Sequence, residues 1–206
     1  MKSMLRYFAL GLVLLSTLLS ISACFPLVAG SAVVTGFVAV DRRTSGAMLE
    51  DQSIELKITS RIRDALGEKV HITVTSYNRK VLLTGEAPDQ HDKDRAGEIA
   101  KSVDNITSVW NEIGVTSITT LTERTNDLIA AGRIKADLID AKDLFSNAYK
   151  IVVERGNVYV MGRITAREAK RVASVISGVT GVKKVVLVHE SITEDELANL
   201  QAKPSK

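Results

Sequence analysis

The sequence predicts an α+β protein made of two tandem, small αββαβ sandwiches, which follow a signal segment and a linker. Two observations support this fold class. A pattern of apolar residues recurs at a spacing of 76–77 residues, and helical and strand periodicities alternate in the same order within each copy. The expected units are 54–117 and 122–190, with a tail at 191–206.

The N-terminal segment has the features of a secretory signal peptide. A basic start with Lys2 and Arg6 precedes an apolar run at 7–19, the order expected of such peptides. The next residues, 21–24, read Ile-Ser-Ala-Cys and resemble the bacterial lipobox. In proteins with that motif the thiol takes a diacylglycerol, the peptide is cut before the cysteine, and the new amine is acylated. We therefore expect a signal peptide at 1–23 and lipidation of Cys24, the chain's single cysteine. The alternative is an ordinary secretory signal or membrane helix with an incidental cysteine.

A connector is expected after Cys24, so that the lipidated N-terminus and linker together span 24–53. Residues 27–40 are apolar but number only 14, whereas a helix needs about 20 apolar residues to cross a bilayer. This stretch is expected to lie at the membrane surface or to act as a loose tether. The polar residues 41–46 are expected to be linker.

The composition fits a folded protein. Removal of 1–23 leaves 183 residues, and the whole chain is 45% hydrophobic and 25% charged, values typical of globular domains. A single cysteine excludes an intramolecular disulfide.

The first unit begins with a helical stripe of isoleucines at 54, 58 and 62. Alternating residues at 72–76 predict a strand, 77–80 a turn, and 81–84 a second strand. Asp89 is a plausible helix N-cap, and the helix after it extends to Val103. A strand at 109–115 closes the unit.

The second unit repeats this order. The expected elements are a helix near 126–141, strands at 149–154 and 158–161 around a turn at 155–157, a helix at 166–177 and a strand at 182–189. Gly156 suits a tight hairpin. Residues 194–200 of the tail are expected to form a short helix.

This pattern resembles the BON domain. The resemblance is carried by hairpins whose second strand ends in glycine (VLLTG at 81–85, VYVMG at 158–162) and by Val-x-Gly-Val-x-x-Val at 179–185. Two such domains behind a lipobox resemble the dual-BON lipoproteins of the Gram-negative outer membrane. The resemblance implies a lipid-anchored protein facing the periplasm that binds anionic phospholipid, supports envelope integrity and is linked to cell division.

Catalytic and metal-binding patterns are not expected. His71, His91 and His189 are scattered and lack the spacing of metal ligands, and no nucleophile motif or phosphate-binding loop is found. Gly85 and Gly162 are interpreted as backbone constraints, and Trp110 and Tyr159 as core or sheet-face residues. We expect no enzyme, cofactor, metal or nucleic-acid partner.

The two first helices differ on their outer faces. In the first, the outer face is polar apart from Leu56. In the second, apolar residues also lie away from the inward stripe, with two cations beside them. The candidate membrane-binding residues are Leu128, Ile129, Arg133, Lys135, Ala136 and Ile139. A helix that is apolar on two faces is buried on both or inserted into something, so these residues meet either lipid or the first unit.

Charge favours the lipid interpretation. Residues 54–113 hold nine Lys/Arg and ten Asp/Glu, a net charge of −1, whereas residues 127–190 hold eleven and seven, a net charge of +4. Basic residues near apolar ones are attracted to anionic bilayers. The expected partner is a membrane containing phosphatidylglycerol or cardiolipin, with envelope or division proteins as further candidates. The alternative function is a protein-interaction module or periplasmic chaperone that docks an envelope assembly machine.

Overall fold

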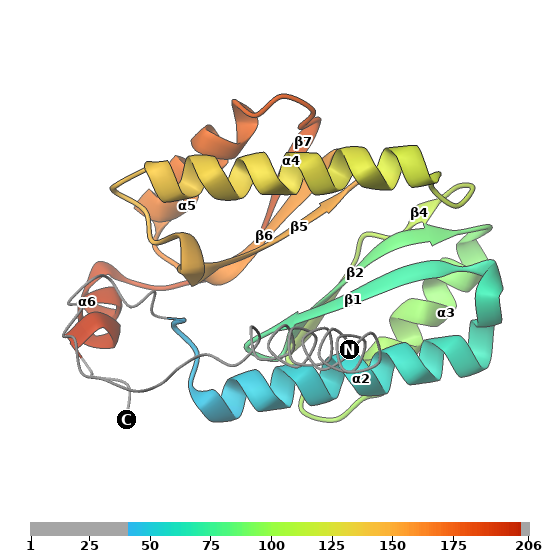
Figure 1. Ribbon diagram of the computed structural model, residues 1–206. Coiled ribbons are helices and arrows are strands. Elements are labelled where there is room, and N and C mark those ends of the chain that lie inside the picture. The colour runs from blue at the N-terminus through green and yellow to red at the C-terminus, as the bar shows by residue number, and fades with distance from the viewer. Residues whose placement is uncertain (1–40, 203–206) are drawn as a thin grey trace, which may run out of the picture. The chain divides into compact units, whose positions relative to one another are not determined.

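The structure, a computed structural model, describes residues 41–202. The predicted signal peptide, Cys24 and the apolar segment 27–40 lie outside the described residues. The rest folds as two αββαβ units followed by a short helix (Figure 1). The predicted fold class is confirmed.

The first unit contains two helices and a mixed sheet. Its elements are α2 (Ser45–Leu66), a 3-10 turn (Gly67–Lys69), β1 (His71–Tyr77), β2 (Lys80–Ala87), α3 (Gln90–Lys101), β3 (Ser108–Asn111) and β4 (Gly114–Val115). Strand β1 pairs antiparallel with β2, and both β3 and β4 pair parallel with β2. The single strand expected at 109–115 is therefore two short strands.

The second unit repeats the arrangement. Its elements are α4 (Leu121–Asp140), a 3-10 turn (Ser146–Ala148), β5 (Tyr149–Glu154), β6 (Asn157–Ile164), α5 (Ala166–Ser177) and β7 (Lys184–Ser191). The strand order is β5-β6-β7, with β7 parallel to β6. The tail forms α6 (Glu194–Ala202), which confirms the predicted short helix.

Both first helices begin earlier than expected. Helix α2 starts at Ser45, nine residues before the predicted start of the unit, because the Thr44 side chain caps it by accepting a hydrogen bond from the Ala47 N–H at 3.1 Å. Helix α4 starts at Leu121, behind the N-cap Thr120. Neither first turn carries the apolar period that marks the rest of its helix, so periodicity placed the starts too late.

Glycine is required where each hairpin's second strand passes its neighbour. A Cβ at Gly85, where φ is +106°, would lie 2.0 Å from the His71 carbonyl oxygen, and a Cβ at Gly162 would lie 2.7 Å from the Ala148 carbonyl oxygen. These contacts are too short for any side chain. The interpretation of both glycines as backbone constraints is confirmed.

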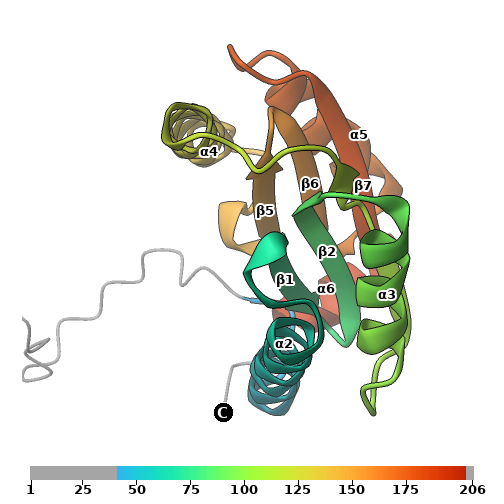
Figure 2. The same ribbon diagram turned by 90° about the vertical axis from the view of Figure 1, so that its right-hand side faces the viewer.

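Each sheet buries one face under its own pair of helices. In the first unit Val81 and Leu83 point to α2 and α3, and in the second Val158 and Val160 point to α4 and α5. The alternation along β2 and β6 is the period of two expected of strands. The helices therefore lie on the outer side of each sheet (Figure 2).

The two sheets pack against each other through their remaining faces. Tyr77 and Leu82 of the first sheet join Tyr159 and Met161 of the second in one buried cluster, with Trp110 packed against it. Trp110 and Tyr159 are thus sheet-face residues, as interpreted. Because the middle of β2 and of β6 is buried on both faces, residues 81–83 and 158–161 form unbroken apolar runs.

The polar segment 41–44, here called the strap, is part of the folded body and not a free linker as expected. The Arg42 guanidinium donates hydrogen bonds to both carboxylate oxygens of Glu168, at 2.8 and 2.7 Å. The neighbouring Arg43 donates to Asp51 at 2.8 Å. No local pattern in the sequence indicates the first contact, because its partners lie 126 residues apart.

Candidate functional site

Helix α4 is set on its sheet by buried apolar side chains on one side. Ala130, Ile134 and Leu138 face the core. A capping box fixes the start, since the Glu123 N–H donates to the Thr120 hydroxyl at 3.2 Å and the Thr120 N–H donates to the Glu123 carboxylate at 2.8 Å. The inward stripe therefore determines which residues face outward.

An aspartate, buried at Asp51 and half-buried at Asp127, holds each first helix on the hairpin of its unit. The Asp127 carboxylate accepts the backbone N–H groups of Arg155 and Gly156 at 2.7 and 2.9 Å. In the first unit Asp51 accepts those of Asn78 and Arg79, both at 2.7 Å.

These four turn residues all have positive φ, as a two-residue type I′ turn requires. Sequence reasoning assigned this role to neither aspartate. The signal that could have found them is their spacing of 76 residues, which is that of the repeat.

The outward face of α4 is apolar and exposed. The exposed fractions are 73% for Leu128, 48% for Ile129 and 60% for Ile139. Leu121, which sequence reasoning left outside the helix, lies on the same face at 82%. We call Leu121, Leu128, Ile129, Ala136 and Ile139 the apolar face of α4. Within the part of the chain that the structure describes, no element buries it, so packing against the first unit does not account for it.

Two cations flank this face. Arg133 and Lys135 are exposed, and at 100° per residue they lie on opposite sides of it. Gly132 lies at the centre, and a Cβ there would meet nothing within 4 Å. The structure thus brings together all six candidate residues from 128 to 139, whereas Cys24 lies outside the described residues.

The outer face of α2 is less polar than expected. Leu49 and Leu56 are 69% and 67% exposed and lie seven residues apart, hence on one side of the helix. The prediction that Leu56 is the single apolar exception is wrong, because the helix starts earlier and its first turns add Leu49. This smaller apolar pair provides a matched comparison for α4.

Carboxylates of both units meet beside the hairpin of the second. Glu86 is fully buried, with His71 Nδ1 3.2 Å and Arg155 Nη1 3.7 Å from its carboxylate oxygens. Burial, and then the negative charges of Glu86 and Asp127, raise the pKa of the half-buried Glu154 to about 7. This group therefore titrates near neutral pH.

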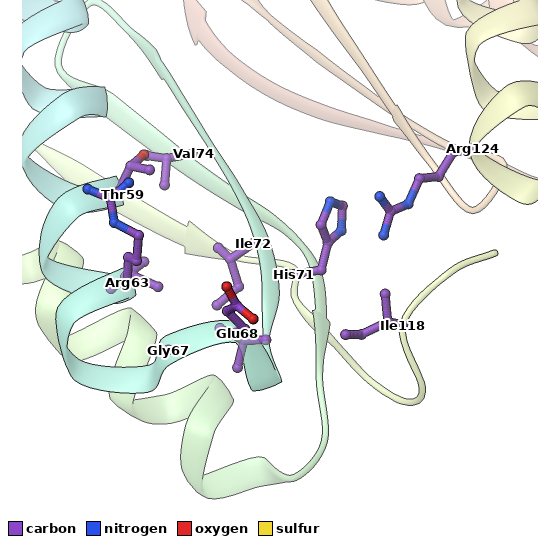
Figure 3. Close-up of a pocket in the computed structure, with 11 residues that line it drawn as sticks. Thr59, Arg63, Gly67, Glu68, His71, Ile72, Val74, Ile118 and Arg124 are labelled. Atoms are coloured by element: carbon purple, nitrogen blue, oxygen red, sulfur yellow. The ribbon is translucent and has the colours of Figure 1, made fainter. Parts of the chain in front are cut away.

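A cavity of about 320 Å³ lies at the C-terminal end of α2 (Figure 3). Its apolar lining includes Ile62, Ile72 and Ile118, and Figure 3 shows Arg124 and His71 on one side of it. Arg63 and Glu68 add charges of both signs. This mixture selects no class of ligand.

One group of side chains among the described residues has the spacing of a cation site. Ligand atoms of Asp89, His91 and Asp92 lie within 4.8 Å of one another. Asp89 caps α3 by accepting the Asp92 N–H at 2.9 Å, and Lys69 Nζ lies 2.7 Å from the Asp92 carboxylate. Helix capping and this ion pair account for the cluster without a metal.

Within residues 41–202, none of the helices combines the length and the apolar character that a membrane span needs. The fold and the site together define a protein with two repeated α/β domains, one of which presents an apolar helix face. Comparison with known proteins identifies these domains.

The model of the BON domain matches residues 51–117 and 126–187. The chain belongs to the BON-domain family. It is 29% identical to the outer membrane lipoprotein DolP of Haemophilus influenzae over 85% of this chain and 92% of that protein. It is also 30% identical to the 21 kDa hemolysin of Actinobacillus pleuropneumoniae over 72% of this chain and 78% of that protein.

These relatives confirm the predicted class, a dual-BON lipoprotein, and the predicted outer-membrane location. Among solved structures, CdsD of the Chlamydia trachomatis type III secretion system matches 77% of this chain and 99% of its own. The identity is 12% and the TM-score 0.30, values too low to imply a common arrangement.

Proposed function

We propose that this protein is anchored to the outer membrane through lipid on Cys24 and binds anionic phospholipid through the apolar face of α4. In this role it supports envelope integrity, including at division sites. The expectation that it is not an enzyme stays a prediction.

One observation carries the proposal: four large apolar side chains lie exposed on one side of α4, with Arg133 and Lys135 flanking them. Transfer of apolar surface from water is worth about 25 cal/mol per Å². Each Lys or Arg near an anionic membrane surface strengthens binding by about 1 kcal/mol. The second domain's excess of basic residues acts in the same direction.

The anchor and the helix face have complementary roles. A single acyl chain gives only marginal membrane binding, whereas the several chains expected on Cys24 hold the protein at the bilayer and the face of α4 adds a second contact. Acyl chains on Cys24 raise the effective concentration of α4 at the bilayer, so a weak intrinsic affinity is sufficient.

The test is vesicle sedimentation of the mature chain carrying Cys24→Ser, which cannot be lipidated. We expect binding to phosphatidylglycerol vesicles and little binding to phosphatidylcholine vesicles. Ile129→Glu should lower the affinity by about tenfold, the equivalent of 1.4 kcal/mol.

Leu56→Glu is the matched control, because it makes the same kind of change on the exposed side of α2 and should leave binding unchanged. Equal binding of the Ile129→Glu and parent proteins would refute the site. If the parent protein does not bind vesicles but cross-links to an envelope protein, the alternative function of a protein-interaction module is favoured.

A further inference from the structure

The strap is held by both domains at once, through two neighbouring arginines. Arg43 contacts the first domain, donating to Asp51 and lying 4.3 Å above the Tyr77 ring. Arg42 contacts the second, donating to Glu168 and, at 2.7 Å, to the Arg163 carbonyl oxygen. The segment that continues into α2 of the first domain is thus fastened to the second domain as well.

The Arg42–Glu168 pair is a buried ion pair with specific hydrogen-bond geometry. Its two side chains are 3% and 1% exposed, and their hydrogen bonds are bidentate, the geometry in which arginine binds carboxylates most strongly. Burial alone would raise the pKa of Glu168, but hydrogen bonds from Arg42 and the Thr165 backbone lower it below its ordinary value. Both groups are therefore charged in the folded protein.

The contact lies at one particular end of the second domain. Glu168 is the third residue of α5 and part of its capping box. That end of α5 lies beside the chain leaving α4, since Arg171 Nε donates to the Asp143 carboxylate at 2.9 Å. The strap is therefore fixed near the end of α4 that carries Ile139.

We propose that Arg42 is a positioning residue for membrane contact. Lipid on Cys24 holds the N-terminus at the bilayer, and the Arg42–Glu168 pair fixes the point at which the chain that follows meets the second domain. The anchor then brings α4, and not α2, to the membrane, although the chain enters the fold through α2. This inference rests on the proposed function.

The first experiment needs no membrane. In the Cys24→Ser chain we compare tryptic cleavage after Arg43 in the parent protein and in a double variant, Arg42→Gln with Glu168→Gln. The double variant removes both charges, so no unpaired ion stays buried, and glutamine preserves the capping box. Cleavage should accelerate by about tenfold or more, because the strap is released. Arg95→Gln, an exposed arginine on α3, is the control.

The second experiment uses the lipidated chain in phosphatidylglycerol vesicles, with Ala136→Cys carrying an environment-sensitive fluorophore. We expect a membrane signal that falls several-fold in the Arg42→Gln, Glu168→Gln background. Vesicle binding of the unlipidated double variant should equal that of the unlipidated parent, because α4 is unchanged.

The outcomes separate the two proposals. A membrane signal that the double variant keeps, or strap cleavage that does not accelerate, overturns the role of Arg42 alone. A parent protein with no membrane signal and no binding without the lipid overturns the proposed function, and this inference with it.

Discussion

Asp51 and Asp127 are the residues on which each domain's geometry most depends. Each accepts two backbone N–H groups of a turn whose residues have positive φ, and Asp51 also accepts from the Ser76 hydroxyl at 2.7 Å and from Arg43. A buried donor left without its acceptor costs about 1–3 kcal/mol. The two aspartates therefore determine how the hairpins meet their helices.

We predict that Asp51→Ala lowers the free energy of unfolding by about 3 kcal/mol or more, since four donors, among them the buried Ser76 hydroxyl, lose the same acceptor. Asp127→Ala should cost less, because fewer donors depend on it. Urea denaturation followed by circular dichroism measures both. Asp64→Ala, on the exposed side of α2, is the control, and losses no larger than those of this control would contradict the role.

At the scale of the element, α4 combines local helix signals with an outer face that local signals do not explain. The capping box and the inward stripe fix the helix. The apolar outer face stays exposed in the described part of the chain. The favourable free energy of burying it is therefore gained only on contact with a membrane or another molecule. Gly132 interrupts that face, and a Cβ added there would meet nothing within 4 Å.

We expect Gly132→Ala to stabilise the protein by about 0.5–1 kcal/mol, since alanine is a better helix former than glycine and the added methyl meets open space. Thermal unfolding gives the change in Tm. Gly97→Ala on α3 provides the contrast, because its Cβ would lie 2.7 Å from the Asn111 side-chain nitrogen. A lower Tm for Gly132→Ala would show that the helix is constrained there.

At the scale of the whole molecule, charge and packing join the two domains. The sheets share one apolar cluster, Asn78 Nδ2 donates to Glu190 at 2.7 Å, and Lys150 Nζ donates to Glu55 at 2.7 Å. The cluster around Glu86 and Glu154 weakens the contact between the domains, because it places negative charges close together where the domains meet. The contact between the domains should therefore depend on pH.

The pKa of Glu154 is raised to about 7 by burial and neighbouring carboxylates, so the folded state binds this proton more tightly than the unfolded state. Its contribution to stability is complete below about pH 4.5 and is lost as the pH rises through 7. We predict that Glu154→Gln reduces the loss of stability between pH 5 and pH 8.

Urea denaturation at each pH measures this dependence, with Glu98→Gln, an exposed carboxyl on α3, as control. An unchanged pH dependence in the Glu154→Gln protein would exclude Glu154 as the titrating group.

Sequence reasoning was most successful where the determinants are local. The helix expected at 166–177 has the same bounds as α5. Its ends are marked locally, since Thr165 and Glu168 form a capping box and Gly178 follows the last turn. The candidate residues on α4 were found because a 100° period separates inward from outward positions. Leu121 was missed because the first turn of α4 has no apolar period of its own.

The sequence alone therefore determined the repeat, the order of the elements and all the residues of the helix face except Leu121, because each depends on neighbours within a few turns of the chain. The tertiary structure decided what covers each face. For β2 and β6, only the fold shows that the second side of each strand packs against the sheet of the other domain. The Arg42–Glu168 contact likewise joins residues 126 positions apart, and no local pattern records which distant charges become neighbours when two sheets pack.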